Sequence, residues 1–150
     1  MPEKETIDRA REDAREGKSP STQAGEFVRE EMHHIREGKH GAASSKQAIA
    51  IGLSKARRAG VKLQSPSGGK ASERTAKQAD LDLEKGRSHS RRKPSAKRSR
   101  ATSQALKREG RSAASHRALS RQARSAAKKR SSTSRTNSAM RASRTRRKRG

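Results

Sequence analysis

The chain has 150 residues, a formal net charge of +25, 37% charged residues, 26% hydrophobic residues and a single aromatic residue. The length suggests one domain at most. The composition falls in the range of disordered proteins for most of the chain. Because cysteine is absent, the sequence excludes a disulfide framework and a thiolate metal site.

The charge is distributed unevenly. Residues 1–43 carry ten acidic and eight basic residues, whereas residues 44–85 carry nine basic and four acidic residues. Residues 86–150 carry 23 Lys and Arg, with Glu109 as their single acid. No apolar run reaches the roughly 18 residues that span a bilayer, and the acidic first residues are not those of a signal peptide. We therefore expect a cytoplasmic protein with a cationic tail and no membrane partner.

Residues 1–18 are predicted to form a short helix over Thr6–Glu16 that ends at Gly17. Residues 19–63 are predicted to form a helical hairpin. Its first helix begins at Ser19, an N-cap followed by Pro20 at the first helical position, and stops at Gly38.

The second helix of this hairpin carries clear signals at both ends. Ser44 and Gln47 form a capping box at its start, and Gly60 fits the left-handed position after its end. Gly52 would let another helix approach closely. Few apolar residues close the hairpin, so we expect it to be marginal alone, and to dimerise or to fold on a partner. These residues are Phe27, Val28, Met32, Ile35, Ile49 and Leu53.

The rest of the chain lacks a sustained apolar pattern. Residues 64–85 are predicted to be a linker with a possible transient helix capped by Ser72. Residues 86–150 consist mainly of Ser, Arg, Lys and Ala. The predicted fold class is therefore a mostly disordered chain with a small all-α head, a two- or three-helix hairpin followed by a basic intrinsically disordered tail.

Two stretches of the head resemble a known family. They are R-E-E-M-H-H-I-R-E-G-K at residues 29–39 and S-K-Q-A-I-A-I-G-L-S-K-A-R-R-A-G at residues 45–60. They are similar to a small bacterial and viral family of unknown function whose hallmark is a K-Q-A-I-A-I-A-L-S-x-A-R-x-A-G box. The resemblance covers about residues 24–63, with Gly52 in place of the usual Ala and Lys55 where Glu is common. The resemblance implies where the head begins and ends, but it does not imply any particular activity. The tail resembles, in composition, the basic tails of bacterial linker-histone-like proteins.

Basic residues are the candidate nucleic-acid-binding residues, because each one that meets a phosphate releases a condensed counterion. If Ser112–Lys129 becomes helical on binding, four of its cations share one face within about 60°. The tail contains no aromatic residue that could stack on a nucleic-acid base. This favours contact with the phosphate backbone. The tail candidates are Arg91, Arg92, Lys93, Lys97, Arg98, Arg100, Arg117, Arg121, Arg124, Lys128, Lys129, Arg130, Arg144, Arg146, Arg147, Lys148 and Arg149; the head candidates are Lys55, Arg58 and Lys62.

The sequence carries no recognised pattern for catalysis. His33, His34 and His40 are interpreted as surface or helix-end histidines, because no carboxylate completes a recognised metal-ligand spacing. No serine lies in a Gly-x-Ser-x-Gly elbow, and the glycines at 68–69 lack the Walker spacing. We expect no enzymatic activity, no cofactor and no metal.

These patterns favour a sequence-nonspecific DNA-binding protein of the nucleoid that neutralises phosphates with its tail and dimerises or docks through its head. Two alternatives stay open. One is an RNA- or ribosome-associated basic protein, since RNA would accept the same charges. The other is a protein-interaction module whose tail acts only as an electrostatic anchor.

Overall fold

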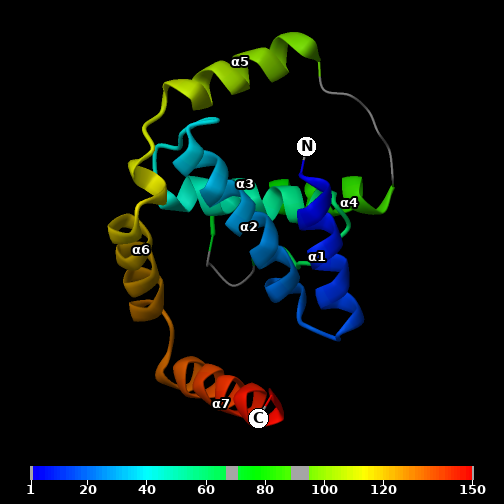
Figure 1. Cartoon of the computed structure of the whole chain (residues 1–150), viewed down its shortest axis with the longest axis vertical. Coiled ribbons are helices and arrows are strands. Elements are labelled where there is room, and N and C mark those ends of the chain that lie inside the picture. Colours follow the sequence, from blue (N-terminus) through cyan, green and yellow to red (C-terminus); the bar gives the residue numbers. More distant parts are fainter. Residues whose placement is uncertain (1, 67–70, 89–94, 150) are drawn as a thin grey trace. The chain divides into compact units, whose positions relative to one another are not determined.

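The computed structural model describes residues 2–66, 71–88 and 95–149, and over these residues it is all-α. The described part divides into two units, residues 1–115 and residues 116–150. Its elements are α1 (Lys4–Arg15), α2 (Pro20–Glu37), α3 (Ser45–Arg58), α4 (Glu73–Arg87), α5 (Ala96–Arg108), the 3-10 turn η1 (Ser112–Ala114), α6 (His116–Lys128) and α7 (Ser132–Arg149) (Figure 1).

Serine side chains begin several of these helices. The Ser19 hydroxyl accepts a hydrogen bond from the Thr22 amide (3.4 Å), and Ser44 accepts one from the Gln47 amide (3.2 Å). Ser72 caps α4 in the same way, so these three predicted caps are confirmed. Ser95 caps α5, a helix that the composition of the tail did not predict.

Glycines end the first three helices. Gly17, Gly38 and Gly60 have φ values of 70°, 80° and 97°, a region that favours glycine. After α3, the Val61 amide donates to the Ala56 carbonyl and the Gly60 amide to the Arg57 carbonyl, which is the predicted Schellman arrangement. After α2, the equivalent bond from Lys39 to His34 turns the chain sharply out of the helix axis.

Helices α2 and α3 pack closely and form the centre of the first unit. The approach is closest at Gly52, where an added Cβ would lie 2.7 Å from the Val28 Cα. Figure 1 shows α3 running across α2, so the two helices do not form the simple hairpin that the sequence predicted. Of the predicted core residues Phe27, Met32 and Ile35 are buried, while Val28, Ile49 and Leu53 are half-buried.

Helices α1 and α4 complete the packing around this pair. Ala10 of α1 is buried against Phe27 and Ala56, with Ile7 beside them. An α4 glycine, Gly86, lies against the Arg57 carbonyl, which a side chain at that position would strike. The predicted boundary at residue 86 therefore falls inside α4.

The prediction of a disordered tail is wrong, because the structure describes α5, η1, α6 and α7 within it. The prediction of disorder rested on the high charge of the tail. It gave too little weight to the high helix propensity of Ala, Arg and Lys. It also missed a docked segment, residues 106–114, whose carbonyl groups accept hydrogen bonds from the head. The donors are the Gly41 amide to Leu106 (2.8 Å), the Ala42 amide to Gly110 (3.2 Å), Ser45 Oγ to Ala113 (2.6 Å) and Arg36 Nε to Ala114 (3.0 Å).

Replacing Gly41 with Ala should release this docked segment, because the new Cβ would strike the Glu109 carbonyl. The Ala42 amide, which donates to Gly110, should then exchange its hydrogen faster by about tenfold or more, as expected for overpacking. Hydrogen–deuterium exchange on the full chain measures this. Gly25→Ala is the matched control, since nothing lies within 4 Å of its added Cβ. Unchanged exchange at Ala42 in Gly41→Ala would show that residues 106–114 do not dock there.

Candidate nucleic-acid interface and a buried carboxylate–histidine cluster

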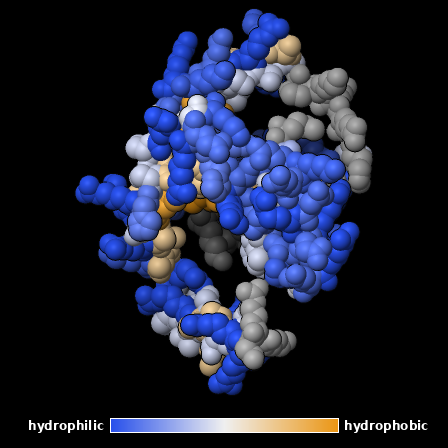
Figure 2. All heavy atoms as spheres, in the orientation of Figure 1, coloured by the Kyte–Doolittle hydropathy of each residue, from blue (hydrophilic) through white to orange (hydrophobic). Residues whose placement is uncertain are grey.

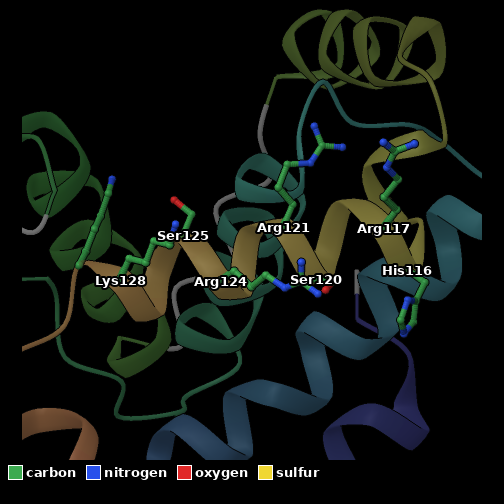
Figure 3. A pocket seen from close by; sticks show the side chains of 8 residues that line it. His116, Arg117, Ser120, Arg121, Arg124, Ser125 and Lys128 are labelled. Carbon is green, nitrogen blue, oxygen red and sulfur yellow. The ribbon is translucent and has the colours of Figure 1, made fainter. Parts of the chain in front are cut away.

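The second unit is a cationic surface. Residues 116–150 carry 13 Lys and Arg and no Asp or Glu. The predicted stripe of Arg117, Arg121, Arg124 and Lys128 lies on α6, and all four residues are exposed. In Figure 3 the side chains of Arg117 and Arg121 extend from the same side of the helix. The four cations therefore form a continuous charged face without a carboxylate in the same unit.

An open recess lies between these side chains (Figure 3). All but one of the residues that line it lie on α6, and the remaining one, Lys129, directly follows that helix. Ser120 and Ser125 alternate with the basic residues and add hydroxyl donors. A recess of this kind, between side chains of a single helix, is suited to a polyanion lying along the surface rather than to an enclosed small molecule.

Further candidates extend this surface along the tail. Those on α5 and α7 whose side chains are described are exposed, and Figure 2 shows a largely hydrophilic face. Arg130 is exposed but donates to the Ser134 carbonyl (3.1 Å), so it also holds the first turn of α7. The exposed set is Lys97, Arg98, Arg100, Lys129, Arg130, Arg144, Arg146 and Arg147; Lys148 and Arg149 lie in α7 with undescribed side chains, and Arg91, Arg92 and Lys93 lie outside the described residues.

The three head candidates differ from the tail. Lys55 lies 2.6 Å from a Glu31 carboxylate oxygen, and Arg58 Nε lies 2.8 Å from Asp82 Oδ1. Lys62 is exposed. Two of the three cations therefore already face carboxylates inside the head.

Asp82 is a buried residue of α4 that the sequence did not single out. Its carboxylate is 1% exposed and accepts hydrogen bonds from Ser54 Oγ (2.6 Å), Arg58 Nε (2.8 Å) and Gln78 Nε2 (3.3 Å). The i, i+4 spacing of Ser54 and Arg58 places both donors on one face of α3. Asp82 thereby fastens α4 to α3.

Replacing Arg58 with Ala should destabilise the first unit by about 1–3 kcal/mol, because it leaves the buried Asp82 carboxylate without its cation. Lys62→Ala removes an equal charge from an exposed position and should change the free energy of unfolding by less than about 0.5 kcal/mol. Denaturant unfolding of the full-length variants measures both values. Equal stability of the two variants would mean that Arg58 does not support Asp82.

A second buried polar group joins α2 to α3. Glu30 is 4% exposed and Glu31 is 0% exposed, although charged side chains are rarely buried unless they are paired. Lys55 approaches both carboxylates, and His40 Nε2 lies 3.2 Å from Glu31 Oε1. His34 lies next to Glu30, with 4.0 Å between Nδ1 and Oε1.

The sequence interpretation took His34 and His40 as surface or helix-end residues, and the structure places both next to these glutamates. Ligand atoms of Glu31, His34 and His40 all lie within 4.8 Å of one another. One signal was present in the sequence: Glu31 and His34 are spaced i, i+3, which places both on one face of a helix. His40 approaches Glu31 because of the turn after α2. The spacing of residues in the sequence does not predict that approach.

Comparison with known proteins finds a family model that matches part of the chain. Residues 18–67 match a family of unknown function (DUF6496), which agrees with the resemblance of the head. The match covers α2 and α3 and includes the buried cluster, but it ends before the basic tail. No curated protein and no solved structure matches the chain. Over the described residues, the helices are too short or too polar to cross a membrane.

Proposed function

We propose that the protein binds DNA without sequence specificity through the cationic surface of its tail. The observation that carries this proposal is that residues 116–150 hold 13 basic residues and no acidic one, with four of the basic residues on one exposed face of α6. A cationic surface without internal carboxylates has no competing intramolecular partner within its own unit, and polyanions supply the compensating charge.

The geometry of the α6 face suits a phosphate backbone. The eleven helical steps from Arg117 to Lys128 span about 16 Å. Duplex DNA offers one negative charge for about every 1.7 Å of its axis, so several phosphates lie within that span. Arg and Lys bind phosphates by charge-assisted hydrogen bonds that do not read base identity. Binding is therefore expected to be independent of sequence.

DNA compaction in the nucleoid would follow from many such contacts along one chain. The exposed cations of α5 belong to the first unit, and those of α6 and α7 belong to the second. One chain therefore offers two basic parts, and compaction does not require a head dimer. Among the described residues, Leu81 and Met140 are the large hydrophobic residues that are exposed, which gives a dimer little apolar surface. Dimerisation stays a prediction from the sequence.

Replacing Arg117, Arg121, Arg124 and Lys128 together with Gln should weaken DNA binding and its dependence on salt. Each lost phosphate contact removes about 0.9 from the slope of log K against log salt, so the slope should become shallower by about 3 to 4. Gln preserves the helix, because its propensity is close to that of Arg and Lys. Fluorescence anisotropy with a random-sequence duplex at several salt concentrations measures the slope.

A matched variant tests whether the face or the net charge matters. Replacing four exposed cations of the first unit with Gln removes the same formal charge and should change the slope by less than about 1. An equal loss in both variants would contradict a binding face on α6 and leave only a general charge effect. The control residues are Lys4, Arg11, Arg15 and Lys46.

Competition between nucleic acids tests the choice of partner. At one fixed salt concentration, duplex DNA should displace a labelled DNA probe at a lower concentration than a structured RNA of equal length. Stronger displacement by the RNA would favour the RNA- or ribosome-associated alternative. If neither polymer binds above the level of a basic peptide of equal charge, the tail serves as an anchor for a protein-binding head.

A further inference from the structure

The buried cluster of the head has one negative charge too many. The Glu30 and Glu31 carboxylates are both buried, and Lys55 is the single Lys or Arg that approaches them among the described residues. One ammonium cannot balance two carboxylates, and burying an unbalanced charge costs several kcal/mol. A further positive charge is therefore required at this place, either as a proton on a neighbouring histidine or as a bound cation.

The oxygen atoms of the cluster are also short of hydrogen bonds. Among the residues that the structure describes, none donates a hydrogen bond of acceptable geometry to Glu30 Oε1 or to either carboxylate oxygen of Glu31. Lys55 Nζ lies 2.6 Å from Glu31 Oε2 and forms an ion pair with it. Because buried polar atoms normally have partners, Glu31 Oε1 is the oxygen that remains open to a further positive charge.

The hydrogen bonds of His34 determine which of its ring nitrogens is available. Its Nε2 lies 2.8 Å from Glu3 Oε1. An ionised carboxylate only accepts hydrogen bonds, so His34 Nε2 carries the proton. The lone pair of the neutral ring is then on Nδ1, the atom that faces Glu30.

His40 is oriented by the same logic. Its Nδ1 lies 3.1 Å from the Gly41 carbonyl oxygen, which can only accept, so Nδ1 carries the proton. The lone pair of the neutral ring is then on Nε2, which lies 3.2 Å from the unpartnered Glu31 Oε1. Two lone pairs that face each other at this distance repel unless a cation lies between them.

We propose that Glu31, His34 and His40 bind one Zn²⁺ ion. Two neutral imidazoles and one carboxylate form a ligand set that zinc favours. Donor atoms around a tetrahedral zinc are roughly 3.3 Å apart, given metal–ligand distances of about 2.0–2.1 Å. The separation of His40 Nε2 and Glu31 Oε1 is already 3.2 Å, and all three ligands lie within 4.8 Å of one another. The third ligand needs only a small closure.

The fold explains how these three residues meet. Glu31 and His34 lie on one face of α2, and the left-handed turn at Gly38 returns His40 to the same face. Lys55 from α3 stays near Glu31 Oε2, which leaves Oε1 for the metal. Glu3 plays the part of the outer carboxylate that commonly orients a metal-bound histidine.

The cluster is also reachable from solvent. An open recess of about 200 Å³ lies beside it and is lined by residues that include Glu3, Glu30 and His34. His34 is the proposed ligand that lines this recess, so an ion would approach the cluster from the side of His34. Because Gly41 and Ala42, which donate to residues 106–110, directly follow His40, the bound ion would also fix the loop that holds the docked segment.

Isothermal titration of the full-length protein with zinc chloride tests the proposal, using protein purified without a histidine tag and freed of metal with EDTA. One zinc ion per chain should bind. His40→Ala and Glu31→Gln should each weaken binding by about 100-fold or more, since even loss of an outer partner weakens metal binding by about 10- to 100-fold. His33→Ala is the matched control, because His33 is exposed and adjacent to His34 in sequence.

Two further measurements separate ligand loss from loss of folding. Zinc should raise the melting temperature of the wild type and of His33→Ala, but not that of His40→Ala, with circular dichroism confirming that each variant is helical. Glu3→Gln should retain the fold and weaken zinc binding by about tenfold, as expected for a residue that orients His34. Cobalt in place of zinc should give the visible spectrum of a tetrahedral site.

Clear outcomes would overturn the proposal. Absence of saturable zinc binding to the wild type, together with an NMR signature of His40 protonated on both ring nitrogens, would mean that a proton supplies the missing charge. Equal weakening by His33→Ala and His40→Ala would place the zinc on surface histidines. Either result would leave DNA binding by the tail untouched, because that proposal does not depend on this cluster.

Discussion

The distribution of carboxylates decides what each part of this protein can do. Every acidic residue of the chain lies before residue 110, so the ion pairs of the molecule belong to the first unit. There they fasten helices together, as Asp82 joins α4 to α3 and Glu31 meets Lys55 between α2 and α3. The second unit has no carboxylate of its own. Its basic side chains therefore need negative charge from a binding partner, and a polyanion supplies that charge.

Close contacts between backbones contribute much of the packing in the first unit, because its apolar side chains are few. Gly52 lets α3 contact Val28, Gly86 lets α4 contact the Arg57 carbonyl, and Gly41 lets residues 106–110 lie against the head. At each of these positions a side chain would separate two backbones. Hydrogen bonds and van der Waals contacts between main chains replace part of the hydrophobic burial that the composition lacks. A low content of large apolar residues is therefore compatible with an ordered first unit.

Local signals predicted the helix ends of the head well, but they missed the helices after residue 95 and the way the elements pack. Ser19, Ser44, Gly38 and Gly60 determine their helix ends by hydrogen bonds within a few residues, and such ends can be recognised in the sequence. The docking of residues 106–114 depends on bonds between groups more than sixty residues apart, and no local pattern encodes them. The burial of Glu30 and Glu31 also could not be predicted, because it depends on residues that are distant in the sequence. On a helix that is read alone, adjacent glutamates indicate a solvated face, and only the packing of α3 takes them out of water.

The family match covers the buried cluster of the head and leaves out the basic tail. Residues 18–67 contain the buried glutamates, both histidines and Lys55, whereas the cationic face of α6 lies wholly outside them. A buried, charged cluster of this kind costs folding free energy unless something compensates it, since apolar residues of similar volume would serve packing at least as well. This cost is one reason for the proposal that the cluster binds a cation. The basic tail, by contrast, needs only charge and helix propensity, which many sequences supply. On the two proposals, the matched segment depends on a few residues held in place by packing, whereas the tail depends on cations that share one exposed face of α6.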